Sequence, residues 1–237
     1  MAGTLHLIPV ALCDARWPDF LPQATRDAAC RLRHFVVENA KTARAELKRI
    51  AHPVPLRELD IEVLPENPEA SDIDRLLAPL LAGRDLGLMS EAGCPAVADP
   101  GALLVRRAHE LDIPVKPLTG PSSLLLALMA SGLNGQSFAF QGYLPAREPE
   151  RSRRIAELEA VSARLGQTQL FIETPYRNTA LFQALLATCR PRTLLCIATD
   201  LSLASESIHT HAVVDWKKRT PPSLERRPTV FLLLSAA

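Results

Sequence analysis

The segment of residues 89–101, M-S-E-A-G-C-P-A-V-A-D-P-G, constrains the fold of this chain more than any other. An apolar run, residues 86–89, leads into it, and a helical pattern, residues 102–108, follows it. Small residues let main chain approach a ligand closely, and open α/β sheets bind small molecules where a strand ends in such a loop before a helix. An ordinary strand-to-helix connection is the alternative, but such loops usually run about two to six residues. The pattern therefore predicts a ligand-binding loop.

The first half of the chain alternates strand and helix patterns, which is typical of a parallel α/β sheet. The expected strands are residues 5–12, ending near Pro9, and residues 34–38, 56–64, 86–89 and 113–118, the last being short and buried. The expected helices are residues 23–33, residues 41–50 with Asn39 as N-cap, a helix capped by Ser71 and Asp72 that ends at Gly83, and residues 102–111.

The second half ends in consecutive strands. We expect strands at residues 137–144, 169–173, 193–198, 208–216 and 229–234, the fourth of them antiparallel, and helices at residues 124–131, at 149–165 and up to about 188. The sequence therefore predicts two α/β domains, residues 1–118 with a mostly parallel sheet and residues 119–237 with a mixed sheet.

A second turn of small residues, Thr119-Gly120-Pro121-Ser122-Ser123, follows the strand at residues 113–118. Pro121 suits the first turn of a helix, and the serine hydroxyls suit either free helix amides or a ligand. A helix start would explain the turn by itself. However, turns in successive strand–helix units converge on one edge of a parallel sheet, so we expect both turns to face the same ligand.

Composition narrows the function without deciding it. The 237 residues carry a formal net charge of +1, which gives no global field for nucleic acid or a membrane. No signal peptide or bilayer-spanning run is visible. The five cysteines lack metal-ligand spacing, which indicates reduced thiols in a cytoplasmic protein. His209 and His211 share a strand face that could suit a metal, but no third ligand is apparent, so we expect none.

Several ordered motifs resemble the tetrapyrrole methylase superfamily, and the closest branch looks like the ribosomal RNA small-subunit methyltransferase I family, ribose 2′-O-methyltransferases. The motifs are Ser90-Glu91-Ala92-Gly93-Cys94-Pro95 with Asp99-Pro100-Gly101, Leu118-Thr119-Gly120-Pro121-Ser122, Ala130-Ser131-Gly132-Leu133, Gln141-Gly142-Tyr143-Leu144-Pro145, and Glu173-Thr174-Pro175-Tyr176-Arg177. The resemblance implies a homodimer of two-domain chains, with S-adenosylmethionine held largely by loop backbone in a cleft between the domains.

Carried over position by position, the resemblance implies a set of cofactor-binding residues: Pro9, Ser90, Glu91, Ala92, Gly93, Gly120, Ser122, Ser123, Thr174 and Pro175. Other positions depart from the RNA branch. Residues 8–12 read Ile-Pro-Val-Ala-Leu without the usual Gly-Asn, residues 38–41 read Glu-Asn-Ala-Lys, and Glu91 replaces an aspartate. Compared with the RNA enzymes of the resemblance, we also expect a shorter chain without their extra C-terminal segment. Because these changes fall on the expected substrate side, the substrate is less constrained than the cofactor.

Methyl transfer from a sulfonium is an in-line displacement, in which a hydroxyl nucleophile gains from a general base. We expect Glu91 or Asp99 to orient or deprotonate the acceptor. The alternatives are that Asp99 caps the helix after Pro100 and that Glu91 only balances the sulfonium charge.

Three functions remain open: methylation of RNA, methylation of a tetrapyrrole or another metabolite, and cofactor binding without catalysis. Two clusters of basic residues suit a phosphate backbone, although interspersed glutamates also fit a solvated helix face. They are Arg147, Arg151, Arg153 and Arg154, and Lys217, Lys218, Arg219, Arg226 and Arg227.

Overall fold

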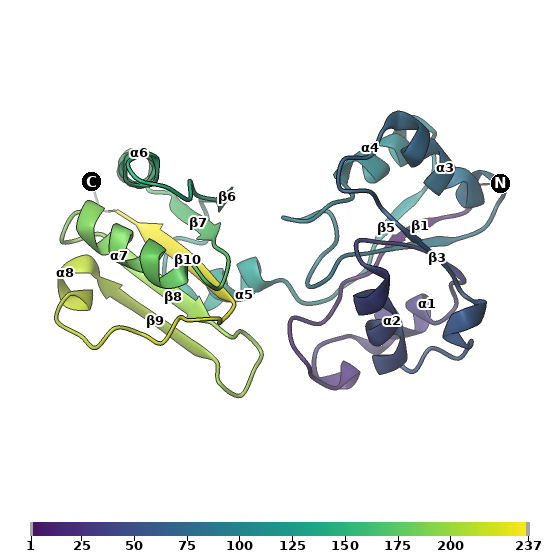
Figure 1. Cartoon of the computed structure of the whole chain (residues 1–237), viewed down its shortest axis with the longest axis horizontal. Coiled ribbons are helices and arrows are strands. Elements are labelled where there is room, and N and C mark those ends of the chain that lie inside the picture. Colours follow the sequence, from purple (N-terminus) through teal and green to yellow (C-terminus); the bar gives the residue numbers. More distant parts are fainter. Residues whose placement is uncertain (1, 236–237) are drawn as a thin grey trace. The chain divides into compact units, whose positions relative to one another are not determined.

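The computed structural model describes residues 2–235. Contacts within the chain divide it into two units, Met1–Ser122 and Ser123–Ala237. The division falls inside the turn at residues 119–123, a few residues after the predicted boundary at Leu118. Each unit contains one five-stranded sheet with its own helices (Figure 1). No helix in the described part of the chain is long and apolar enough to cross a membrane.

Unit 1 contains a parallel sheet in the order β3-β2-β4-β1-β5. Its strands are β1 (Leu5–Leu7), β2 (His34–Val37), β3 (Asp60–Val63), β4 (Leu86–Met89) and β5 (Val115–Pro117). Its α-helices are α1 (Gln23–Ala29), α2 (Ala40–Arg49), α3 (Ala70–Leu81) and α4 (Ala102–Glu110), and short 3-10 turns lie at Trp17–Asp19 and Leu56–Glu58.

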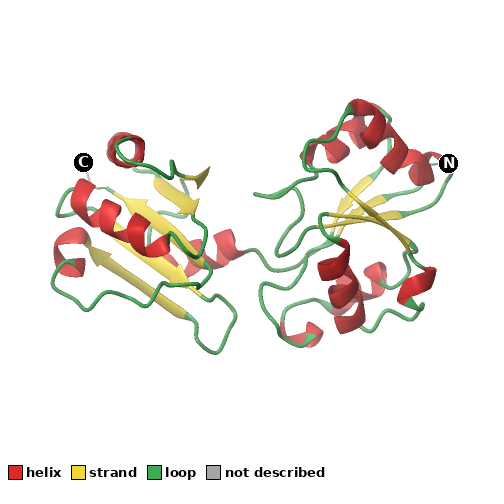
Figure 2. Cartoon of the chain, viewed as in Figure 1, coloured by secondary structure: helices red, strands yellow, loops and turns green. Residues whose placement is uncertain are grey.

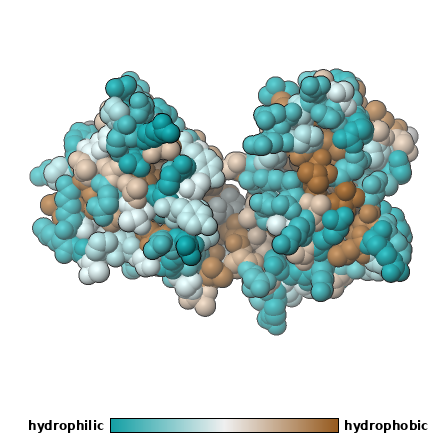
Figure 3. Space-filling view, in the orientation of Figure 1, coloured by the Kyte–Doolittle hydropathy of each residue, from teal (hydrophilic) through white to brown (hydrophobic). Residues whose placement is uncertain are grey.

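The two faces of this sheet are covered by different helix pairs, as Figure 2 shows. Side chains of α3 and α4, such as Leu76 and Leu104, pack on one face, and side chains of α1 and α2, such as Ala29 and Leu47, pack on the other. The central strand β4 is buried along its whole length. Between the helix pairs the visible surface of unit 1 carries a hydrophobic band (Figure 3), and Val63 of edge strand β3 is 48% exposed.

The parallel sheet and most helix positions are confirmed, and four details are corrected. Strand β1 ends at Leu7, because Pro9 has no amide hydrogen to continue the ladder. Strand β3 starts only at Asp60, after a 3-10 turn. Strand β5 is an edge strand with two exposed residues, so it is not buried. Helix α3 is capped by Glu69, and the two predicted caps lie within the helix, where Asp72 completes a capping box.

Unit 2 contains a mixed sheet in the order β6-β7-β10-β8-β9, in which only β6 and β7 run parallel. Its strands are β6 (Phe138–Tyr143), β7 (Thr168–Ile172), β8 (Leu194–Thr199), β9 (Ser207–Ala212) and β10 (Thr229–Leu234). Its helices are α5 (Ser123–Ser131), α6 (Glu150–Leu165), α7 (Asn178–Thr188) and α8 (Val213–Trp216). Helix α5 packs on one face, and α6, α7 and α8 pack on the other.

The strand predicted for residues 208–216 is wrong in its second half. Strand β9 ends at Ala212, and the chain turns into α8. The turn buries Trp216, whose indole nitrogen donates a hydrogen bond to the Leu195 carbonyl at 2.8 Å and whose ring meets Phe182 edge-on. Burial of this large ring, which the period-2 pattern does not register, ends the strand.

Candidate active site

The order of strands in unit 1 creates a crevice at the carboxyl ends of β2 and β4. The chain leaves β2 toward β3 on one side of the sheet and leaves β4 toward β5 on the other. Loops that diverge from neighbouring strands in this way open a ligand-binding crevice in α/β proteins. The residues that follow these strands are Glu38 after β2 and Ser90 and Glu91 after β4.

The loop after β4 is fixed to the segment that follows β1. Val10 and Gly93 exchange both main-chain hydrogen bonds, at 2.8 and 3.0 Å, in an isolated antiparallel bridge. Gly93 has a φ of +70°, a conformation that favours glycine. One residue later, the Cys94 thiol donates to the Pro121 carbonyl at 3.4 Å. The loops after β1, β4 and β5 therefore form one connected rim, and the two turns of small residues lie at the same edge of the sheet.

Gly120 makes the closest approach within this rim. An added Cβ atom at Gly120 would lie 2.3 Å from Cβ of Pro9, far inside normal contact distance. The Thr25 hydroxyl also donates to the Thr119 carbonyl at 2.8 Å and holds the turn from its other side. Only glycine fits here, because the turn packs directly on the residue that ends the first strand.

Three carboxylates gather at the crevice. The Glu91 amide donates to Oε2 of Glu38 at 3.0 Å. The pKa of Asp99 is raised to about 6, mainly by burial; a hydrogen bond from Ser90 opposes this rise, and the charges of Glu38 and Glu91 add to it. A carboxylate with this pKa is a general base near neutral pH.

Asp99 also lines a small pocket of about 170 Å³. The lining also includes Leu64, Glu66 and Ile73, from the segment that leads from β3 into α3. Helix α4 takes Gly101 as its N-cap without any side-chain hydrogen bond. Asp99 therefore does not occupy the N-cap position of α4 that was its alternative role.

The structure brings together the predicted residues of unit 1, and the other predicted residues belong to unit 2. The rim contains Pro9, Gly120 and the predicted loop of residues 90–93, whereas Ser122 is the last residue of unit 1. Ser123 begins α5 of unit 2. The Thr174 amide and Arg177 both donate to Oε1 of Glu173 at 2.6 Å, at the carboxyl end of β7.

Sequence reasoning missed the buried carboxylate of Glu46 on helix α2. It pairs with Arg49 at 2.6 Å, and Arg49 in turn donates to the Cys13 carbonyl at 3.4 Å and to Asp14 at 2.9 Å. Burial raises the pKa of Glu46 against the pull of the arginine. The spacing of Glu46 and Arg49 on one helix face was the available signal.

No group of three or more potential metal-ligating side chains occurs within residues 2–235. The rings of His209 and His211 stack on each other with centroids 6.2 Å apart.

Comparisons with known proteins identify the family. Residues 10–213 match the family model of tetrapyrrole (corrin/porphyrin) methylases. A Ribosomal RNA small subunit methyltransferase I from Xylella fastidiosa is 31% identical over 206 residues, 87% of this chain and 71% of that protein. A protein of the same name from Vibrio cholerae is 35% identical over 133 residues, 56% of this chain and 45% of its own length. Several other curated relatives are likewise matched over about half their length.

Two crystal structures share the fold. The methyltransferase CobJ superposes with a TM-score of 0.64 at 18% identity, over 100% of this chain and 95% of its own. A uroporphyrin-III-C-methyltransferase from Thermus thermophilus gives 0.56 at 18% identity, over 99% of this chain and 93% of its own. The predicted two-part α/β fold and the resemblance drawn from the loop motifs are both confirmed. The chain belongs to the tetrapyrrole (corrin/porphyrin) methylase family.

Proposed function

We propose that this chain is an S-adenosylmethionine-dependent methyltransferase that acts on RNA, at a ribose 2′-hydroxyl of small-subunit ribosomal RNA. The observation that carries the proposal is the half-buried carboxylate of Asp99, with a pKa near 6, beside a rim of interlocked loops. The printed names of the curated relatives support the RNA substrate. We also propose that the chain is a cytoplasmic homodimer, which light scattering after size exclusion tests.

The residues of unit 1 fit the proposed cofactor. S-adenosylmethionine carries a positive sulfonium and an amino group, and Glu38, Glu91 and Asp99 supply negative charge at the crevice. The tight packing of Gly120 on Pro9 keeps side chains out of the rim, so that main-chain groups face the ligand. Thr174 and Pro175 of unit 2 remain predicted contacts in this proposal.

When bound, the cofactor would supply a methyl group on a sulfonium, and its transfer would leave the electrons of the broken carbon–sulfur bond on sulfur. The hydroxyl oxygen of the acceptor forms the new bond to carbon, and its proton goes to the carboxylate of Asp99. Ser90 holds that carboxylate through its hydrogen bond, and Glu91 and Glu38 keep it basic by their charge. The connected loops orient the reactants and exclude water.

Incubation with labelled S-adenosylmethionine and hypomethylated small ribosomal subunits tests the proposal. We expect label in RNA at a position resistant to alkaline cleavage, with kcat/KM rising with pH to a plateau above about 6. Asp99→Asn should lose this pH limb and most of the rate, and the fall in kcat should exceed any weakening of cofactor binding that follows from the lost charge.

Glu91→Gln distinguishes the role of Glu91 from that of Asp99. If cofactor binding and turnover are unchanged in this variant, Glu91 has no part in the mechanism. Label in an added tetrapyrrole but not in RNA would support the alternative substrate. Cofactor binding with no methylation of RNA, tetrapyrrole or total metabolites would contradict catalysis.

A further inference from the structure

A second pocket lies in unit 2, away from the loops at β4. The segment of residues 217–228, here called the strap, connects α8 to β10. A pocket of about 550 Å³ lies between the strap and the face of β9 that carries His209 and His211. This volume falls in the range of small-ligand sites, roughly 300–1,000 Å³. No part of the proposed methyl-transfer chemistry uses it.

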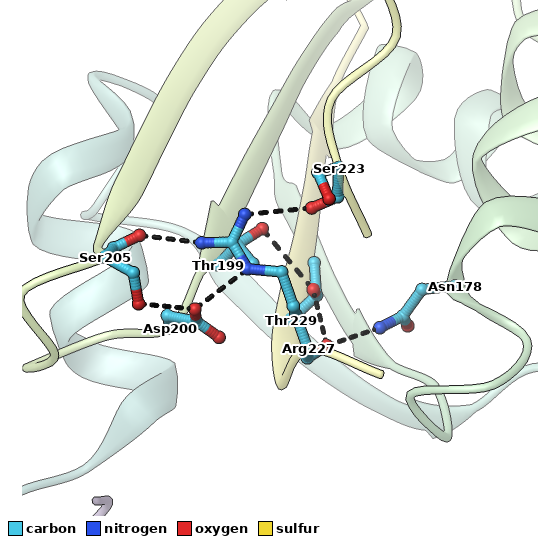
Figure 4. A network of polar contacts seen from close by, with 7 residues as sticks. All are labelled: Asn178, Thr199, Asp200, Ser205, Ser223, Arg227 and Thr229. Carbon is cyan, nitrogen blue, oxygen red and sulfur yellow. Dashed lines mark hydrogen bonds and ion pairs between the residues drawn. The ribbon is translucent and has the colours of Figure 1, made fainter. Parts of the chain in front are cut away.

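Arg227 fastens the strap to the sheet (Figure 4). Its Nε donates to Asp200 at 2.8 Å, one terminal nitrogen donates to the Ser223 carbonyl at 3.0 Å, and the other donates to the Ser205 carbonyl at 2.7 Å. The Asn178 amide and the Thr229 hydroxyl donate to the Arg227 carbonyl at 2.7 and 3.0 Å. All three guanidinium nitrogens are therefore engaged, so Arg227 builds the pocket wall and its charge is balanced by Asp200.

The charge that remains for a ligand comes from Lys218 and Arg219. Lys218 has only a long contact of 3.8 Å with Asp215, and both side chains are largely exposed, so the pair is weak. Arg219 has no carboxylate within 4 Å among residues 2–235. Burial lowers the pKa of His211, and the charges of Arg219 and His209 lower it further while Asp215 opposes them. The pocket lining includes Lys218, Arg219 and Arg227 and, among the described residues, no carboxylate, so its uncompensated charge is positive.

Hydroxyls and rings complete the pocket. Thr199, Ser207, Thr220 and Ser223 lie in its lining and offer hydrogen bonds to phosphate or ribose oxygens. His209 is exposed and stacks on half-buried His211, which also meets Trp216 edge-on with centroids 4.9 Å apart. His211 therefore contacts two neighbouring rings, whereas exposed His209 contacts His211 and lies outermost.

We propose that this pocket binds the phosphate backbone of an RNA strand, with Lys218 and Arg219 as its cationic contacts and the strap as its support. The inference rests on the proposed function, because RNA is the phosphate-rich substrate assigned there. A positive pocket rich in hydroxyls suits a phosphodiester, and it provides affinity at a distance from the reacting methyl group.

The test compares two double variants that remove equal charge. Lys218→Ala with Arg219→Ala empties the pocket of free cations, whereas Arg192→Ala with Lys217→Ala removes two exposed cations outside it. Fluorescence anisotropy measures binding of a labelled single-stranded RNA of about 16 nucleotides at several salt concentrations. Circular dichroism and thermal melts verify that both variants fold.

Each lost phosphate contact lowers the slope of log K against log salt by about 0.7, which is roughly fivefold in Kd at 0.1 M salt. We expect one or two contacts to disappear in the pocket variant and the matched control to keep the wild-type slope. In the wild type, RNA should also shift the imidazole NMR signals of His209 and His211 and leave His34 and His109 of unit 1 unchanged.

Equal losses in the two double variants would overturn the inference, since they would show a diffuse surface charge. Saturation of the pocket by inorganic phosphate or a mononucleotide, with no further gain for RNA, would also overturn it in favour of a small anion. Failure of the proposed function is distinguishable: methyl transfer to RNA would be absent while salt-dependent RNA binding through the pocket persisted.

Discussion

Gly120→Ala tests whether the turn after β5 and the end of β1 are packed as tightly as the structure shows. The new Cβ would lie 2.3 Å from Cβ and 2.7 Å from Cγ of Pro9. The φ of Gly120 lies outside the positive range, so the effect is one of space and not of backbone torsion. Pro9 has a rigid ring and is buried, and its neighbour Val10 is bonded to Gly93.

The magnitude follows from the overlap. Carbon atoms rest about 3.5–4.0 Å apart, so the turn and the strand end must separate by more than 1 Å. Overpacking of this kind costs about 1–3 kcal/mol, and we place this case at the upper end because neither partner is a flexible side chain. The smaller entropy of an unfolded chain with alanine returns about 0.4–1 kcal/mol. We therefore expect unit 1 to lose about 2 kcal/mol of unfolding free energy.

Urea unfolding followed by tryptophan fluorescence measures this loss in one unit at a time. The chain has two tryptophans, and in a Trp216→Phe background the remaining Trp17 reports on unit 1. Gly135→Ala is the control in unit 2, where an added Cβ meets nothing within 4 Å; we expect it to leave the unit 1 transition reported by Trp17 unchanged within about 0.5 kcal/mol.

Calorimetry in the absence of urea adds a functional measurement, in which Gly120→Ala should bind S-adenosylmethionine at least tenfold more weakly. If it matches Gly135→Ala in unfolding free energy and the wild type in cofactor affinity, the described contact between the two loops is wrong.

Three further predictions concern single side chains. The raised pKa of Asp99 means that its contribution to the unfolding free energy is fully present below pH 3.8 and is lost as the pH rises through about 6, where the buried carboxylate ionises. Asp99→Asn removes this ionisation. It should therefore stabilise unit 1 above pH 6 by about 1 kcal/mol, after a discount for partial exposure, and should have no such effect below about pH 3.8. Urea titrations at several pH values measure this. Asn39→Ala should cost about 1 kcal/mol, because the Asn39 side chain accepts from the first free amides of α2, and Asn39→Ser should retain most of it. Arg227→Leu should lower the unfolding free energy of unit 2, followed by Trp216 fluorescence, by about 3 kcal/mol, because Asp200 is left buried without its cation. If Arg226→Leu lowers it by as much, the ion pair between Arg227 and Asp200 does not stabilise the unit as described.

Local sequence patterns determined the elements and much of the rim. The apolar run at residues 86–89 predicted β4, the Asn39 cap predicted the start of α2, and residues 229–234 predicted β10 with its observed bounds. These features depend on near neighbours in the chain, so periodicity and capping chemistry are enough to find them. The two turns of small residues could be found in the same way, because their glycines mark positions where the backbone adopts a positive φ or packs very closely.

Only the tertiary structure decided how distant groups act on one another. The raised pKa of Asp99 depends on burial and on Glu38, which is far away in sequence and is brought near by the order β2-β4 in the sheet. The bend after Ala212 depends on the packing of Trp216 against Phe182. The pocket under the strap depends on the hydrogen-bonded ion pair between Arg227 and Asp200. Burial, electrostatic fields and packing are sums over neighbours in space, and a linear pattern does not contain that list of neighbours.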